Sequence, residues 1–246
     1  MIDTTLMMVT YNRLNLTKET LDDLLNTVNR PYNLVIIDNG STDGTINYLN
    51  TLQDTENVKY HINLVNSNKG IAVGRNIGLK KADELNTQWY CTIDNDVKMP
   101  NGWLDECINI LIANKGFAAI GVNFEDTKYT VITKNGYSFQ DKPHGNLGTA
   151  CMVFTKQLHK MLGFFNTEYG IYGEEDADFG VRTRVLGFKI GYIERMGNHL
   201  GSGLNDIGKY RDFKTKQHND NFPQFRKNCG LYSQKQKQLF IPYKEL

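Results

Sequence analysis

Short apolar runs that stop abruptly at polar residues recur through the first two thirds of the chain. The strongest runs cover residues 6–9, 34–37, 58–65, 89–93, 117–122 and 148–154. Segments with apolar residues at helical spacing follow most of them, at residues 16–28, 46–52, 71–85, 103–111 and 155–162. Such runs are typical of buried strands, and the alternation of strand and helix predicts an α/β fold.

Two parts of the chain depart from this alternation. Residues 123–147 are mostly polar, and a short alternating stretch at 129–132 predicts a hairpin inserted into the fold. Residues 189–193 form a later apolar run, for which we predict a strand at the edge of the sheet. The run at 148–154 opens with small residues, which would let a ligand approach the backbone.

Composition limits the function only broadly. With 246 residues and 40% apolar content, the chain can form one α/β domain, with or without a tail. The formal net charge of +1 argues against a dominant nucleic-acid surface, so we expect no nucleic acid partner. The widely spaced Cys91, Cys107, Cys151 and Cys229 lack the close pairs of a zinc site, and we expect buried free thiols in a reducing compartment. No apolar run is long enough to span a bilayer and the N-terminus lacks a signal-peptide pattern, so we expect a soluble, cytoplasmic protein.

Residues 204–246 differ in charge from the rest of the chain. They hold nine Lys or Arg against four Asp or Glu, with aromatic residues interleaved. Such a segment is typical of an appendage over an active site, of a contact at the inner face of a membrane, or of a solvated basic tail. We predict that it packs on a domain formed by residues 1–203.

Carboxylates end two of the apolar runs. Asp94 and Asp96 follow the run at 89–93, and Asp38 follows the run at 34–37. Side chains alternate along extended backbone, so Asp94 and Asp96 can point into the same site. Open α/β sheets bind ligands at the carboxyl ends of their strands, and carboxylate oxygens suit Mg²⁺ or Mn²⁺. Because Asp and Asn also form ordinary turns and helix caps, these residues alone leave a turn and a ligand site open.

Glycines recur at intervals of four in the third unit. Gly70, Gly74 and Gly78 would lie on one face of a helix and permit close packing there. Their spacing does not match a dinucleotide-binding fingerprint. Arg75 and Lys69 are candidate ligand contacts in this unit, although each can equally be a solvated surface cation.

Four carboxylates crowd one short segment, at Glu174, Glu175, Asp176 and Asp178. At a helix N-terminus the helix dipole stabilises such charges, and Asp178 can pair with Arg182 one turn later. Acids packed so closely nevertheless repel one another unless a cation or a ligand offsets their charge. His199 follows in a glycine-rich loop, where a lone histidine is more often structural than a ligand.

In their order, these motifs resemble those of the family 2 glycosyltransferases, which have the nucleotide-sugar-binding GT-A fold. The matching segments are residues 9–13, 38–45, 68–70, 75–78, 94–96, 148–150 and 173–182, within residues 4–203. One Asp-x-Asp motif has little specificity, whereas a series of motifs in order has much more. Glu174 is an extra residue before the family's usual Glu-Asp pair.

The resemblance implies a mostly parallel central sheet flanked by helices, and transfer of a sugar with inversion. The donor would be a nucleotide-diphosphate sugar, with UDP favoured and GDP as the alternative. The acceptor would be a hydroxyl of a glycan, a lipid-linked molecule or another compound.

The resemblance also implies a role for each candidate residue. Thr10 and Asp38 would face the nucleotide base, Arg75 the base or the diphosphate, and Asp94 the ribose. Asp96 would hold Mn²⁺ or Mg²⁺, with His199 as a further metal ligand or diphosphate contact. Asp176 would be the general base, beside Glu175. The other candidates are Tyr11, Asn12, Arg13, Asn39, Lys69 and Asn95 for the nucleotide and Gly148, Thr149 and Ala150 for the acceptor.

Two other functions fit parts of this pattern. A nucleotidyltransferase would also bind a nucleotide and a metal, but we would expect a glycine-rich loop with a basic residue where this chain has residues 10–13. A non-catalytic sugar-nucleotide-binding subunit is disfavoured because Asp96, Asp176 and His199 occur together. The released product separates the three: nucleoside diphosphate, pyrophosphate or none.

Overall fold

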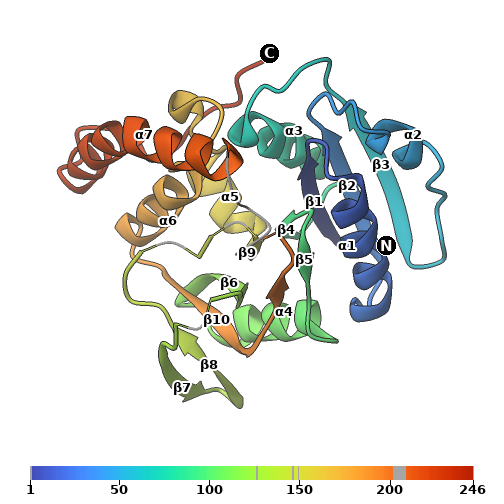
Figure 1. The fold of residues 1–246 in the computed structure, drawn as a ribbon. Coiled ribbons are helices and arrows are strands. Elements are labelled where there is room, and N and C mark those ends of the chain that lie inside the picture. Colours follow the sequence, from blue (N-terminus) through green and yellow to red (C-terminus); the bar gives the residue numbers. More distant parts are fainter. Residues whose placement is uncertain (1, 126, 146, 149, 202–208, 246) are drawn as a thin grey trace.

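The computed structural model describes residues 2–125, 127–145, 147–148, 150–201 and 209–245. Its centre is a nine-stranded, mostly parallel sheet flanked by helices (Figure 1), which confirms the predicted fold class. In spatial order the strands are β3 (Val58–Leu64), β2 (Tyr32–Asp38), β1 (Thr4–Thr10), β4 (Trp89–Asp94), β9 (Cys151–Thr155), β6 (Phe117–Asn123), β10 (Lys189–Met196), β8 (Tyr137–Asp141) and β7 (Thr130–Lys134).

The strand register brings polar residues together at one edge of the sheet. β3, β2, β1 and β4 run parallel, and Thr10 pairs with Asp38 while Val9 pairs with Asp94. β9 is antiparallel to both β4 and β6, and β10 returns to the parallel direction beside β6. The ends of β1, β2 and β4 therefore meet at the edge where ligands bind in open α/β sheets.

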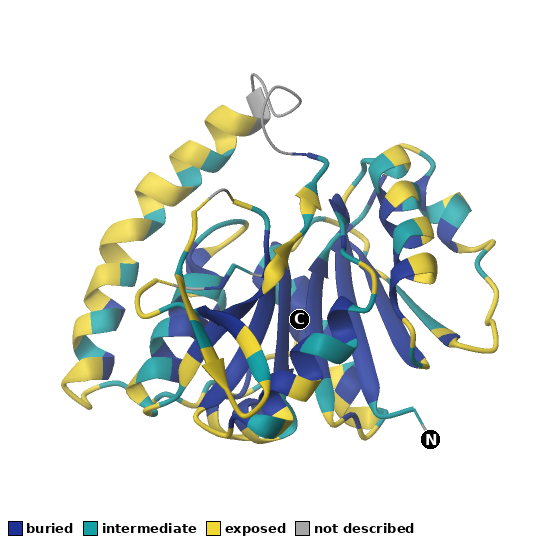
Figure 2. Ribbon diagram, turned by 90° about the horizontal axis from the view of Figure 1, so that it is seen from below, coloured by how far each residue is buried: buried dark blue, intermediate teal, exposed yellow. Residues whose placement is uncertain are grey.

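Helices cover both faces of the sheet, and each face has its own apolar core. Leu21 of α1 (Leu14–Thr27), Leu49 of α2 (Thr45–Leu49) and Trp103 of α4 (Trp103–Ala113) belong to one core. Leu79 of α3 (Ile71–Glu84), Leu158 of α5 (Lys156–Leu162) and Phe179 of α6 (Glu175–Val185) belong to the other. In Figure 2 the central strands of the sheet are dark blue between these layers, as expected for strands covered on both faces.

The glycines of α3 permit the close packing predicted for them. A Cβ atom at Gly74 would lie 2.8 Å from Val9 Cγ1, and one at Gly78 would lie 3.1 Å from Met7 Cβ, so α3 lies directly against β1. Gly70 has φ +97°, and a Cβ atom there would lie 2.6 Å from the Gly170 carbonyl oxygen. Larger side chains at Gly74 and Gly78 would push α3 away from the sheet, and one at Gly70 would meet the backbone of Gly170 and Ile171.

The predicted hairpin is present, but its consequence for the sheet was missed. β7 and β8 form an antiparallel pair around Asn135 and Gly136, which have φ values of 51° and 82°, as in a type I′ turn. β8 pairs with β10 on the side away from β6. The prediction that residues 189–193 form an edge strand is therefore wrong, because the hairpin extends the sheet beyond β10.

The C-terminal segment contains a long helix, α7 (Lys209–Ser233), which lies along α6 and the short 3₁₀ helix η1 (Thr167–Tyr169) (Figure 1). Most of the outer surface of α7 is exposed in Figure 2, whereas Tyr232 is buried. The division of the chain at residue 203 stays a prediction. No helix among the described residues is long and apolar enough to cross a membrane. The four cysteines are free, and all but Cys229 are buried.

Candidate active site

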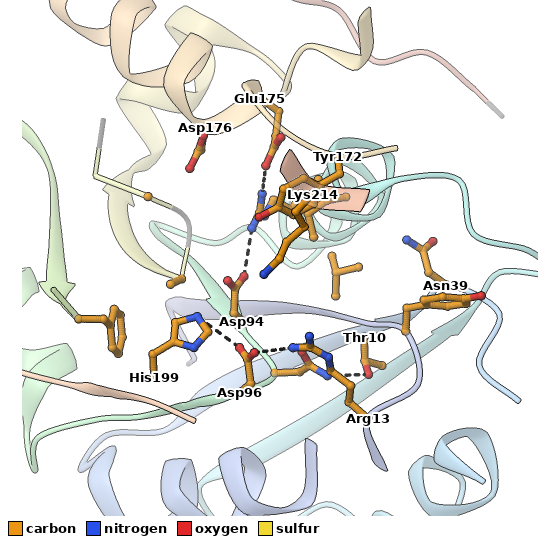
Figure 3. A pocket seen from close by; sticks show the side chains of 18 of the residues that line it. Thr10, Arg13, Asn39, Asp94, Asp96, Tyr172, Glu175, Asp176, His199 and Lys214 are labelled. Atoms are coloured by element: carbon orange, nitrogen blue, oxygen red, sulfur yellow. Dashed lines mark hydrogen bonds and ion pairs between the residues drawn. The ribbon is translucent and has the colours of Figure 1, made fainter. Parts of the chain in front are cut away.

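A cavity of about 960 Å³ opens at the carboxyl ends of β1, β4 and β6 (Figure 3). Most of the predicted site residues line it: Thr10, Tyr11, Asn12, Arg13, Asn39, Arg75, Asp94, Asn95, Asp96, Gly148, Ala150, Glu175, Asp176 and His199. Asp38 and Lys69 do not line it, and Lys69 is exposed. Thr149 lies outside the described residues.

The loop after β1 is held in an unusual conformation. Asn12 and Arg13 have φ values of 57° and 63°, which residues other than glycine adopt rarely. The Asn12 backbone N–H donates to Ser41 Oγ at 2.6 Å, and the Thr42 N–H donates to Asn12 Oδ1 at 2.8 Å. These bonds join the first two loops, and the Arg13 guanidinium reaches Asp96 Oδ2 at 2.7 Å.

The loop after β2 leaves two acceptors buried. Asp38 Oδ1 accepts from the backbone N–H groups of Gly40 at 3.0 Å and Ser41 at 2.8 Å, so Asp38 organises the turn. Asp38 Oδ2 and Asn39 Oδ1 are also buried, and neither has a hydrogen-bond partner among the described residues. A buried acceptor without a donor is costly, so both atoms favour a ligand that supplies N–H groups.

Arg75 connects the third unit to the carboxylates on both sides of the cavity. It is buried in α3, donates from Nη1 to Glu175 Oε1 at 2.5 Å and donates from Nη2 to Asp94 Oδ1 at 3.1 Å. Burial opposes its charge, but Glu175, Asp94 and Asp176 together raise the pKa of Arg75. The side chain predicted as a surface cation or a ligand contact is therefore a buried, charged bridge between Glu175 and Asp94.

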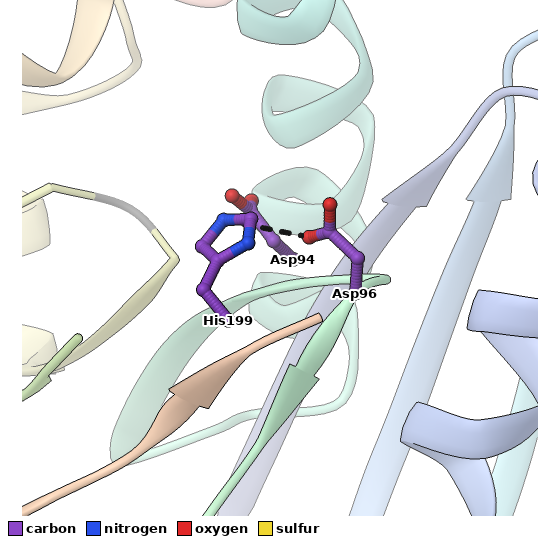
Figure 4. Close-up of side chains that lie close together, drawn as sticks. All are labelled: Asp94, Asp96 and His199. Atoms are coloured by element: carbon purple, nitrogen blue, oxygen red, sulfur yellow. Dashed lines mark ion pairs between the residues drawn. The ribbon is translucent and has the colours of Figure 1, made fainter. Parts of the chain in front are cut away.

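A candidate metal site lies beside this bridge. Asp94, Asp96 and His199 each offer one ligand atom, and these atoms lie within 4.8 Å of one another (Figure 4). β11 (Asn198–His199) pairs with β5 (Val97–Lys98), which holds His199 next to Asp96, with Nε2 3.7 Å from Oδ1. Two carboxylates and an imidazole fit Mn²⁺, and the carboxylates also suit Mg²⁺. Asp94 belongs to this cluster, as the spacing of Asp94 and Asp96 predicted, whereas the family resemblance implied a contact with the ribose.

Asp96 is the most enclosed of the three candidate ligands. Burial and the neighbouring Asp94 raise its pKa, while the positive charges of His199, Arg13 and Lys214 lower it. Gly201 packs against its carboxylate, because a Cβ atom there would lie 2.1 Å from Asp96 Oδ2. This crowding fixes the direction in which the Asp96 side chain points.

The crowded acids at the start of α6 have separate environments. Glu174 has φ 69° and pairs with His218 of α7. Asp178 forms the predicted pair with Arg182, with 2.6 Å between Oδ2 and Nε, and both side chains are completely buried. Neither residue lines the cavity. Glu174 and Asp178 thus each have a partner of their own, away from the cavity.

Glu175 and Asp176 are the two acids of this segment that line the cavity. Burial and the charge of Asp176 raise the pKa of Glu175 to about 7, although the Arg75 guanidinium lowers it. Asp176 is less buried, and its Oδ1 accepts from the Ala177 N–H at 2.6 Å. In Figure 3 its carboxylate lies across the cavity from Asp96 and His199.

Several lining residues escaped the sequence interpretation. They are aromatic or amide side chains without a motif, namely Asn123, Phe124, Tyr172, Tyr192 and Phe213, together with Lys214 of α7. Aromatic residues among many others carry no signal of a site. The basic, aromatic character of residues 204–246 was the available signal for Phe213 and Lys214.

The chain is similar in sequence to known glycosyltransferases. A family model described as Glycosyl transferase family 2 matches residues 5–166. A curated relative from Haemophilus influenzae, described as an uncharacterized glycosyltransferase, is 28% identical over 121 residues. This match covers 48% of the chain and 41% of the relative, so the chain aligns with less than half of that protein's length.

Solved structures share the fold at low sequence identity. The mannosyltransferase PcManGT from Pyrobaculum calidifontis, in complex with GDP-Man and Mn²⁺, has a TM-score of 0.63 and 16% identity over 94% of this chain and 73% of its own. S. aureus TarS in complex with UDP has a TM-score of 0.60 and 15% identity over 80% of this chain and 59% of its own. A TarS complex with UDP-GlcNAc has a TM-score of 0.58 and 17% identity over 82% and 61% of the two chains.

Proposed function

Because the chain belongs to glycosyl transferase family 2, we propose that it moves a sugar from a nucleotide-diphosphate donor to an acceptor hydroxyl in this cavity. One observation carries the proposal: a carboxylate and imidazole cluster and a separate carboxylate, Asp176, line one cavity at the strand ends. PcManGT and TarS, which have similar folds, bind GDP-Man, UDP or UDP-GlcNAc. UDP is the favoured nucleotide here, with GDP as the alternative.

The nucleotide base binds at the first two loops. Uracil and guanine each carry a ring N–H that Asp38 Oδ2 or Asn39 Oδ1 can accept, and both oxygens are buried without a partner among the described residues. Asn39 lines the cavity directly. Asp38 lies behind it, so a small shift of the turn is needed before the base reaches Asp38. Adenine lacks that ring N–H and is expected to bind more weakly.

Asp94, Asp96 and His199 are the residues that would hold the divalent cation. When bound, the cation stabilises the negative charge that develops on the leaving diphosphate. Arg13 and Arg75 orient Asp96 and Asp94 through their ion pairs at 2.7 and 3.1 Å. The assignment of Asp94 to this set replaces its role as a ribose contact.

Asp176 acts as the general base. The acceptor oxygen attacks the anomeric carbon as the bond from that carbon to the phosphate oxygen breaks, and the hydroxyl proton passes to the Asp176 carboxylate. The nucleoside diphosphate leaves with the bonding electrons. Attack from the side opposite the leaving group inverts the anomeric configuration in one step. Gly148 and Ala150, which line the same cavity, contact the acceptor.

A donor screen tests this function. The protein is incubated with UDP-, GDP- and dTDP-sugars in the presence of Mn²⁺ or Mg²⁺, and the nucleoside diphosphate and pyrophosphate released are measured. Release of nucleoside diphosphate from one donor is the expected result. Release of pyrophosphate would instead identify a nucleotidyltransferase, and binding without release of either product, with acceptors supplied, would identify a binding subunit.

A further inference from the structure

α7 contributes to the cavity from outside the family match. The family model ends at residue 166, whereas Phe213 and Lys214 of α7 line the cavity with residues of β1, β4 and α6. In Figure 3 the Lys214 side chain extends toward Asp94, beside Tyr172. A cation on a separate helix is therefore held at the candidate metal site.

The position of α7 is fixed by contacts well away from Lys214. Asn221 Nδ2 donates to the backbone carbonyls of Tyr169 at 2.7 Å and Tyr172 at 2.9 Å. Two turns later, Asn228 Nδ2 donates to the Tyr169 hydroxyl at 2.8 Å. The Tyr232 hydroxyl donates to Asp178 Oδ1 at 3.0 Å. These buried or half-buried bonds hold the helix against η1 and α6, so the fold keeps the helix that carries Lys214 beside the cavity.

The charges of the cavity favour a further cation for an incoming diphosphate. Five carboxylates line it, those of Asp94, Asp96, Glu125, Glu175 and Asp176. Arg13 is paired with Asp96, and Arg75 is shared between Asp94 and Glu175. These arginines, together with Lys214 beside Asp96, offset only part of the negative charge of the carboxylates. A diphosphate brings more negative charge, and a lysine ammonium is a compact, mobile donor well suited to phosphate oxygens.

We propose that Lys214 binds the diphosphate of the nucleotide-sugar donor, so that α7 completes the donor site. The inference rests on the proposed function, because it requires a nucleoside diphosphate in this cavity. The Lys214 ammonium donates charge-assisted hydrogen bonds to the phosphate oxygens on the side facing α7. The C-terminal segment, which carries no recognised motif, thus has a direct role in donor binding.

Calorimetry with two matched variants tests the inference. Lys214→Met removes the charge and keeps the length, whereas Lys216→Met makes the same change at an exposed position on the same helix. Binding of UDP and GDP is measured with Mn²⁺, and UMP and GMP are measured in parallel. For the diphosphate that the wild type binds better, we expect Lys214→Met to raise Kd by about 10- to 100-fold, the range for a hydrogen bond to a charged group. For Lys216→Met the Kd should stay within about twofold of the wild-type value. For Lys214→Met the loss of affinity should be smaller with the monophosphate than with the diphosphate.

The outcomes distinguish failure of this inference from failure of the proposed function. If the wild type binds neither diphosphate, the proposed function and this inference both fail. If the wild type binds one and Lys214→Met binds it equally well, only the inference fails, and the same holds if Lys216→Met loses as much affinity as Lys214→Met. Thermal melts of each variant check the fold, and Lys214→Arg, which restores the charge, should recover most of the affinity.

Discussion

Neighbouring residues of one type have very different environments at the start of α6. Asp178 is completely buried with Arg182, Glu175 is buried against Arg75, and Asp176 lies on the cavity wall. All three are acids within four positions, so residue type alone cannot separate a base from a structural ion pair. The partner of each carboxylate separates them: Glu175 pairs with Arg75 of α3, whereas Asp178 pairs with Arg182 of the same helix and accepts from Tyr232 of α7.

Asp176→Asn should abolish most transfer while donor binding persists. The amide keeps the shape of the side chain but cannot take the acceptor proton, so the transfer rate should fall by roughly 10²- to 10⁴-fold. Transfer is measured at saturating donor and acceptor, with donor affinity measured separately by calorimetry. Glu175→Gln is the control. Should Glu175→Gln lose transfer while Asp176→Asn stays active, the base is assigned one residue too far along the chain.

Glu175 gives the protein a specific pH dependence of stability. Its pKa is about 7 in the fold against an ordinary value of 4.5, because burial and Asp176 disfavour its charge more than Arg75 favours it. The folded state then holds a proton that the unfolded state releases above about pH 4.5, so this group's contribution to stability is lost as pH rises from 4.5 to 7. Urea unfolding of the metal-free protein from pH 4.5 to 8 measures it. Glu175→Gln should flatten the decline, and an unchanged profile would contradict the raised pKa.

At the scale of elements, local pattern predicted most of the sheet and its helices. Apolar runs correctly located β1, β2, β4, β6 and β9, because strands buried on both faces need continuous apolar residues, and a weaker run located the edge strand β3. The strand β10 was located, but its predicted place at the edge of the sheet was wrong. The pattern indicated a hairpin but not the strand with which that hairpin pairs. α7 was not predicted as a helix, since its aromatic and charged residues lack a clear apolar stripe and Pro223 lies inside it.

The same limit applies to the candidate site. Polar residues at strand ends were recognisable because strand ends in α/β sheets are functional positions, and most of them line the cavity. Asp38 and Lys69 also follow strands, but their side chains do not line the cavity. Asp38 accepts hydrogen bonds within its own loop, and Lys69 is exposed to solvent. The contribution of Lys214 depends on how α7 packs, which no local spacing encodes.

Tyr232→Phe should loosen α7. The Tyr232 hydroxyl donates to Asp178, whose carboxylate also accepts from Arg182 and from the Tyr169 hydroxyl. Loss of a buried hydrogen bond to a charged group should lower the free energy of unfolding by about 1.5 to 3 kcal/mol. Denaturant unfolding measures the change, with Tyr137→Phe in the half-exposed hairpin as the control. Equal stability of both variants would mean that α7 is held without this contact.

The whole molecule joins distant parts of the chain around one cavity. The first loops, α3, the end of β4, the start of α6, His199 and α7 each supply one part of its wall. None of these parts forms a site alone, because each carboxylate of the candidate metal site is oriented by an arginine from another element. A ligand that contacts all of them should therefore stabilise the fold as a whole.

Nucleoside diphosphate and Mn²⁺ should raise the melting temperature together. At ligand concentrations of 100 to 1,000 times Kd, binding to the folded state alone adds about 2.7 to 4.1 kcal/mol. For a chain of this length that corresponds to roughly 5 to 15 °C. EDTA should remove most of the shift with the nucleotide still present, since the cation joins the diphosphate to Asp94, Asp96 and His199. Asp96→Asn keeps the volume beside Gly201 but weakens the metal site, so its shift should be small with or without EDTA. A wild-type shift that survives EDTA would show that the arginines and Lys214 suffice to hold the diphosphate, and would remove the cation from donor binding.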